Sequence, residues 1–145
     1  MRNDNARMPS SSVLIRSFAV ATHKSSPSDA AYSNIVATQV DAQPFLYQTG
    51  LLDIPMSPIS DIGAFRNGRW QVEHLLKAIR LAVAWVIERR AVFDFLCHPS
   101  VIGVKDPSFQ AIDLICDLVE QANGRAEIVS LDTIAKRART KLAAN

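Results

Sequence analysis

The sequence predicts an α/β fold in which parallel strands alternate with helices. Its second half gives the order helix, strand, helix, strand, helix, because short apolar runs alternate with segments whose apolar residues recur three and four positions apart. Such alternation is typical of parallel strands joined by right-handed crossovers. The first half offers only two weaker strands, so we expect a sheet that lacks one side.

The first half of the chain is expected to be irregular. Residues 1–12 are polar and predict a flexible leader, followed by one domain over residues 13–145. Residues 13–21 and 51–56 are the two weaker strands, and Pro55 confines the second to a strand end or a sheet edge. Residues 57–70 are expected to form a long loop, and loops of this length are often functional.

The most informative element is a strand that ends on a histidine. Residues 71–90 show the spacing of a helix with one buried face, and an apolar strand over residues 91–96 follows. That strand runs into His98 and Pro99. Active sites of α/β folds collect at the carboxyl ends of parallel strands, so His98 is a candidate functional residue.

The remaining elements follow from capping signals. Asp106 and Pro107 predict an N-cap and a first helical residue, and Gly124 predicts the end of that helix. Residues 126–129 predict a short strand, and Ser130 is expected to cap a last helix.

Composition excludes several classes of protein. At 145 residues, 48% hydrophobic and 21% charged, the chain is expected to fold as one soluble domain. The net charge of +2 is spread along the chain, so we expect no nucleic-acid partner. No run of eighteen apolar residues occurs, so we expect no membrane span and a cytoplasmic location. Cys97 and Cys116 form no CxxC pair and are expected to be small core residues.

Three stretches, residues 51–61, 93–99 and 126–135, carry a resemblance to a known family. By their order and spacing, the chain from about Phe18 to Arg137 resembles the C-terminal half of the polysaccharide deacetylase (NodB-homology) family. The resemblance implies a partial (β/α) barrel that lacks its N-terminal strands. It also implies a hydrolase acting on the C–N (acetamido) bonds of carbohydrates or of small acetylated or amide substrates.

The resemblance also implies roles for particular residues. Full-length relatives hold a divalent metal, Zn or Co, on one aspartate and two histidines, and use a further aspartate as general base. His98 matches the histidine of their late Leu-x-His motif, which is the general acid. Asp61 matches the aspartate that orients this histidine. Phe65, Arg66 and Trp70 match a substrate groove beside it.

The family's Asp-Asp and His-x-x-x-His motifs have no counterpart in this sequence, and neither His23 nor His74 replaces them. We therefore expect a truncated half with the general acid but without a metal triad or cofactor of its own. Without a metal-activated water, such a half is expected to be inactive alone. An open sheet edge would favour a complementing chain or self-association.

Other interpretations stay open at this stage. The fold could be a non-catalytic carbohydrate-binding or interaction module, or a mis-started reading frame with no role of its own. His98 could be a strand-capping histidine, Asp61 an ordinary turn residue and Trp70 a helix-end anchor. The buried Asp94 needs a partner such as Arg66 or Arg90.

Overall fold

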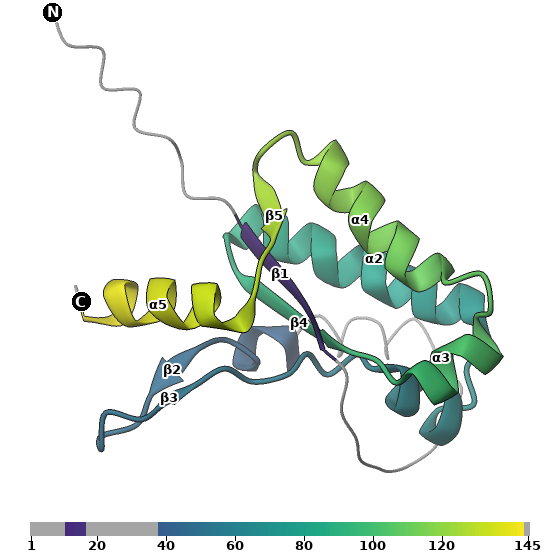
Figure 1. The fold of residues 1–145 in the computed structure, drawn as a ribbon, viewed down its shortest axis with the longest axis horizontal. Coiled ribbons are helices and arrows are strands. Elements are labelled where there is room, and N and C mark those ends of the chain that lie inside the picture. Colours follow the sequence, from purple (N-terminus) through teal and green to yellow (C-terminus); the bar gives the residue numbers. More distant parts are fainter. Residues whose placement is uncertain (1–10, 17–37, 144–145) are drawn as a thin grey trace, which may run out of the picture.

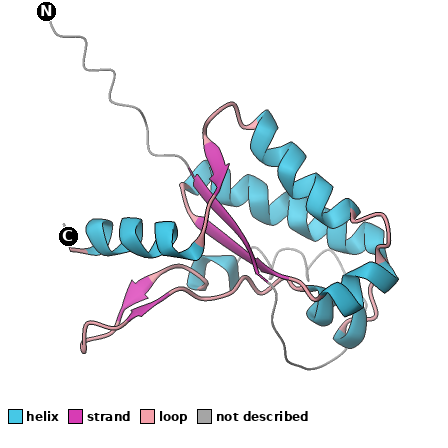
Figure 2. Cartoon of the chain, viewed as in Figure 1, coloured by secondary structure: helices cyan, strands magenta, loops and turns pink. Residues whose placement is uncertain are grey.

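The computed structural model describes residues 11–16 and 38–143. Its helices and strands, drawn in Figures 1 and 2, form an α/β fold with a small open sheet. Strand β1 (Ser11–Arg16) begins two residues before the expected start at Val13. The rest of the expected leader and of the expected first strand, residues 1–10 and 17–21, lies outside the described residues.

The sheet has β1 at its centre. The order is β4 (Val92–Leu96), β1, β5 (Ala126–Ile128), and β1 pairs in parallel with both neighbours. The prediction of parallel strands is therefore confirmed. Within the residues described, these three strands form an open sheet and do not close into a barrel.

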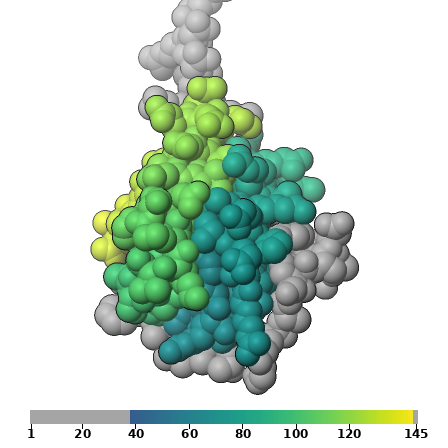
Figure 3. Space-filling model, turned by 90° about the vertical axis from the view of Figure 1, so that its right-hand side faces the viewer, coloured from purple at the N-terminus to yellow at the C-terminus, as the bar shows by residue number. Residues whose placement is uncertain are grey.

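Helices α2 (Val72–Arg89) and α4 (Gln110–Gln121) lie side by side against this sheet, and Figure 3 shows the side of the molecule on which they meet. The bounds of α2 confirm the helix predicted over residues 71–90. Its apolar stripe, which includes Leu75, Ile79 and Val83, is fully buried. Phe93 and Phe95 of β4 face this stripe, with ring centroids 6.0 Å apart and planes 12° from parallel.

Strand β4 is buried on both faces. Successive strand residues point to opposite sides, so Asp94 and Leu96 lie opposite the phenylalanines, and both are also buried. This explains why the sequence there is almost continuously apolar instead of alternating. By the same alternation, His98 follows Asp94 and Leu96 on the face away from α2.

The outer edge of β4 is covered by side-chain and backbone hydrogen bonds from two other segments. The side chain of Gln43 accepts a hydrogen bond from the Val92 amide at 2.8 Å. The Ser57 amide donates to the Asp94 carbonyl oxygen, also at 2.8 Å. These bonds satisfy backbone groups that an edge strand would otherwise offer to another chain. On the far side of β5, no described strand is paired.

The segment over residues 57–70 is not one long loop, and that prediction was wrong. It contains a π-helix, η1 (Ile62–Asn67), which packs against α3 (Pro99–Lys105). Ile62, Ala64 and Phe65 of η1 are buried, so burial of apolar surface favours an ordered turn here. Single-turn π-helices are rare and occur frequently at functional sites.

Helix α3 was not predicted, and Asp106 acts differently from the expected N-cap. Asp106 ends α3, and Pro107 lies between α3 and α4 instead of opening a helix. The Asp106 carboxylate still accepts a hydrogen bond from an α4 amide, that of Ala111, at 2.8 Å. The capping interaction predicted from the sequence therefore exists, but it spans five residues.

The remaining elements are a short hairpin and the last helix. Strands β2 (Phe45–Leu46) and β3 (Leu52–Asp53) form a separate antiparallel hairpin, and β3 ends before Pro55. Helix α5 (Leu131–Leu142) lies beside β2, as Figure 1 shows. Ser130 accepts a hydrogen bond from the Thr133 amide, which confirms the predicted cap.

The two cysteines differ in environment. Cys97 is half-buried and packs against the core, whereas Cys116 is exposed on α4, so the expectation of a core position was wrong for Cys116. None of the helices described is both long and apolar enough to cross a membrane.

Candidate functional site

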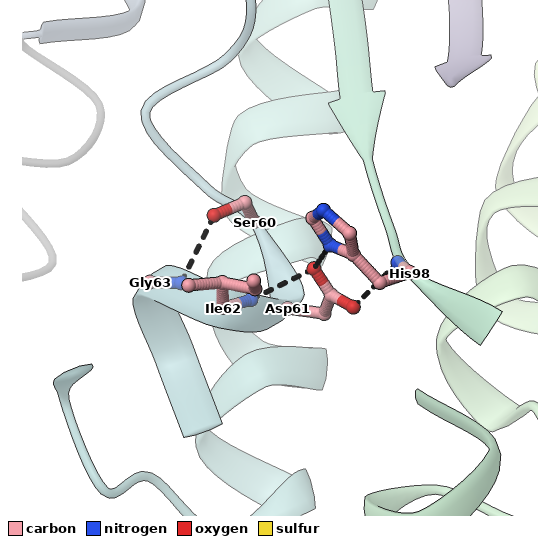
Figure 4. Close-up of polar contacts among 5 residues, drawn as sticks. All are labelled: Ser60, Asp61, Ile62, Gly63 and His98. Carbon is pink, nitrogen blue, oxygen red and sulfur yellow. Dashed lines mark hydrogen bonds and ion pairs between the residues drawn. The ribbon is translucent and has the colours of Figure 1, made fainter. Parts of the chain in front are cut away.

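A backbone bridge brings the two main candidate residues together. Ser60 and Leu96 form an isolated parallel β-bridge, which aligns the segment before η1 with the end of β4. Asp61 follows the first of these residues directly, and His98 follows the second by two positions. Residues 37 positions apart in sequence therefore meet at the carboxyl end of β4, as Figure 4 shows.

The Asp61 carboxylate is completely buried and accepts three hydrogen bonds. Oδ1 accepts from the Ile62 amide at 2.7 Å and lies 2.9 Å from Nδ1 of His98. Oδ2 accepts from the His98 amide at 2.6 Å. One side chain therefore fixes both the backbone and the ring of His98. Hydrogen bonds to a carboxylate are about twice as strong as neutral ones, so this arrangement is rigid.

The geometry determines which nitrogen of His98 is left for chemistry. An ionised carboxylate can only accept, so Nδ1 carries a proton toward Asp61. Nε2 is then the atom that can take up or release a proton. It is buried, and no described residue bonds to it, although 12% of the side chain is exposed. Most buried polar atoms in proteins have a partner, so this exception is notable.

Cys97 lies between β4 and His98, and its thiol pKa depends on burial and on the charge of Asp61. Burial raises the pKa of the Cys97 thiol, and the negative charge of Asp61 raises it further. The thiol therefore stays protonated at neutral pH and is a poor nucleophile. The chemistry available at this end of the strand lies in the histidine.

The residues expected to form a substrate groove lie close to one another but apart from His98. Phe65 is buried and forms a wall shared by two shallow hollows. Arg66 lines the smaller hollow, of about 180 Å³, and Trp70 lines the larger, of about 280 Å³. His98 lines neither, so the described residues do not form the single groove that was expected.

Trp70 occupies a specially shaped turn. A Cβ atom on Gly68 would lie only 2.5 Å from Nε1 of Trp70, so the indole needs glycine beside it. Arg69, between them, has a φ of 53°, which non-glycine residues rarely adopt. The ring also packs against the core, as expected of a helix-end anchor. Backbone strain of this kind concentrates at functional sites.

Two cationic residues of this region were not predicted from the sequence. Arg69 lines the larger hollow, and Lys105, the last residue of α3, lines both. The turn signal of Gly68 could have drawn attention to Arg69. Lys105 carries no such signal, because α3 itself was not predicted.

The donor groups in the described ranges do not fit a divalent metal. Within residues 11–16 and 38–143, no three histidine, cysteine, aspartate or glutamate side chains come together. Both oxygens of Asp61 are also engaged by Ile62 and His98.

The chain matches no family model, and neither a curated protein nor a solved structure was found to be similar to it.

Proposed function

We propose that the chain supplies the general-acid half of a carbohydrate deacetylase-like hydrolase that acts on C–N (acetamido) bonds. We also propose that the chain is related to the polysaccharide deacetylase family and that its parent fold is a partial (β/α) barrel of the deacetylase type. The observation that carries it is the Asp61–His98 pair, with Nε2 left without a partner among the described residues at the end of a parallel strand.

In this reaction, His98 acts on the departing nitrogen. As the C–N bond breaks, Nε2–H of the imidazolium donates its proton to the amine, which leaves as a neutral molecule, and His98 becomes neutral. Asp61 holds the ring in place through its contact with Nδ1. Such general acid catalysis contributes about 10²–10⁴-fold to rate. In this proposal, a complementing chain that carries the metal-binding half performs the attack of water.

The proposal is tested by complementation. The full chain is mixed with the N-terminal half of a deacetylase domain that carries the Asp-Asp and His-x-x-x-His motifs. Acetate release from an N-acetylglucosamine tetramer is then measured with Zn²⁺ or Co²⁺. We expect release from the mixture and none from the chain alone.

Variants assign the activity of the mixture to a residue. His98→Gln is expected to lower the rate by about 10²-fold or more, as removal of a general acid should. The matched control is His74→Gln, a histidine of α2 outside this site, which should leave the rate unchanged. Equal rates for the wild type and His98→Gln, or release by the chain alone, would disprove the proposal.

A non-catalytic carbohydrate-binding module is the second candidate. It is favoured by the separation of the two hollows from His98. In that case the tetramer would bind equally well with and without a metal chelator, and the mixture would release no acetate. The same complementation experiment, repeated with a binding measurement, therefore distinguishes the two functions.

A further inference from the structure

Two adjoining hollows between η1 and α3 are lined by cations. Arg66 and Lys105 line the smaller hollow, and Arg69 and Lys105 line the larger. The described residues lining them include no aspartate or glutamate. Figure 3 shows that the residues around η1 and those around α3 share one side of the molecule.

These cations have no assigned structural role. All three are exposed, and none of their side chains makes a hydrogen bond or an ion pair within the part of the chain that the structure describes. Like charges around these two adjoining hollows repel one another, and the repulsion is relieved when an anion binds between them. An arginine also matches the geometry of a carboxylate or phosphate with two parallel bonds.

The turn that carries Arg69 has an energetically unfavourable backbone conformation. Arg69 is held in a left-handed conformation, and Gly68 leaves room for the Trp70 indole. Trp70 lines the larger hollow next to Arg69. A flat aromatic surface beside a cation suits a ligand that carries both a ring and a negative charge.

The size of the hollows limits the ligand. Each is smaller than the roughly 300–1,000 Å³ of pockets that enclose a drug-sized molecule. One hollow therefore accommodates one ring or one substituent, and the rest of the ligand stays in solvent.

We propose that Arg66, Arg69 and Lys105 bind the oxyanion substituent of a sugar-sized ligand, a carboxylate or a phosphate, whose ring lies against Trp70. This site rests on the carbohydrate-binding candidate and names the class of ligand that the two hollows would take, and no part of it uses His98. An anionic sugar would bind here whether or not the chain takes part in deacetylation.

The test is a titration of the full chain followed by amide NMR at constant ionic strength. The probes are glucuronate, glucose 6-phosphate, inorganic phosphate and neutral glucose. We expect the two anionic sugars to shift amides of η1 and α3, and the tighter of the two identifies the oxyanion. Glucose and inorganic phosphate should each bind at least tenfold more weakly.

Variants then assign the binding to the three cations. Arg66→Gln, Arg69→Gly and Lys105→Gln should each weaken binding about threefold, as removal of one exposed charge does. Arg69→Gly also relieves the left-handed backbone conformation, so added backbone strain does not explain a loss of binding. The matched control is Arg89→Gln, which removes an exposed charge about 25 Å along α2 from Val72.

Three outcomes would overturn the proposal. The first is that glucose binds as tightly as glucuronate, and the second is that inorganic phosphate binds as tightly as glucose 6-phosphate. The third is that Arg89→Gln weakens binding as much as Arg66→Gln does. His98→Gln is expected to leave binding unchanged, so failure of the proposed acid role would be recognised separately.

Discussion

The Asp61→Asn substitution tests whether the buried carboxylate of Asp61 stabilises the fold through its hydrogen bonds. Asparagine has one acceptor oxygen, whereas Asp61 uses both of its oxygens to accept from the Ile62 amide, the His98 amide and His98 Nδ1. Whichever way the new amide turns, its NH₂ group faces one buried backbone N–H. At least one hydrogen bond is therefore lost, and the others become bonds between neutral groups.

The expected loss of stability follows from these bonds. A hydrogen bond to a charged group is worth about 1.5–3 kcal/mol, and a neutral one about 0.5–1.5 kcal/mol. One bond lost and two weakened gives at least about 3 kcal/mol, a large share of the roughly 5–15 kcal/mol that holds a domain folded. With a urea dependence of about 1.5 kcal/mol per molar, the unfolding midpoint should fall by about 2 M.

The assay is urea unfolding followed by circular dichroism, with Asp117→Asn as the control. Asp117 is exposed on α4, so its substitution should change stability by less than about 0.5 kcal/mol. Nitrogen NMR of His98 gives a second measurement, since the proton should leave Nδ1 when an NH₂ group faces it. Equal midpoints for Asp61→Asn and Asp117→Asn would show that the hydrogen bonds of the buried carboxylate do not stabilise the fold.

Four further predictions concern other parts of the chain. Iodoacetamide should modify the exposed Cys116 well before Cys97, whose pKa is raised by burial and by a nearby negative charge, and equal rates would contradict this. Because the folded state raises that pKa, Cys97 contributes stability that is complete below the unfolded thiol pKa and is lost as pH rises through the folded one. Replacement of Cys97 by alanine should therefore flatten the alkaline fall in melting temperature. Gly68→Ala should cost about 1–3 kcal/mol and shift Trp70 fluorescence, because the new methyl group collides with the indole; an unchanged melting temperature would show that the turn adapts. Arg69→Gly should raise stability by about 0.5–1 kcal/mol, the difference between the relieved backbone strain and the entropy cost of glycine, and a fall in thermal melting would contradict it.

Local sequence signals predicted the elements whose stability is local. The apolar spacing of α2 and the side-chain cap at Ser130 were both confirmed, because a helix buries one face and needs one terminal acceptor wherever it lies in the fold. The π-helix η1 escaped prediction because its extra residue per turn breaks the usual apolar period. Helix α3 has only seven residues, too few to show a period.

The candidate site could be predicted only in part. A titratable residue at the end of an apolar strand pointed to His98, and the family resemblance paired it with Asp61. The contact itself depends on the bridge between Ser60 and Leu96. Such pairing between distant residues leaves no local pattern in the sequence. Lys105 was missed for the same reason, because α3 places it beside η1 through packing alone.

The central place of β1 has a consequence for how the chain folds. Val13 pairs with Phe93 and Ser12 with Glu127, so the two ladders join residues 80 and 115 positions apart. During synthesis, the first strand emerges from the ribosome long before either neighbour exists. The loops that close this sheet are therefore long, and a high contact order slows folding. Until β5 arrives, the middle strand is an exposed edge, and a chaperone that shields it would raise the yield of native protein.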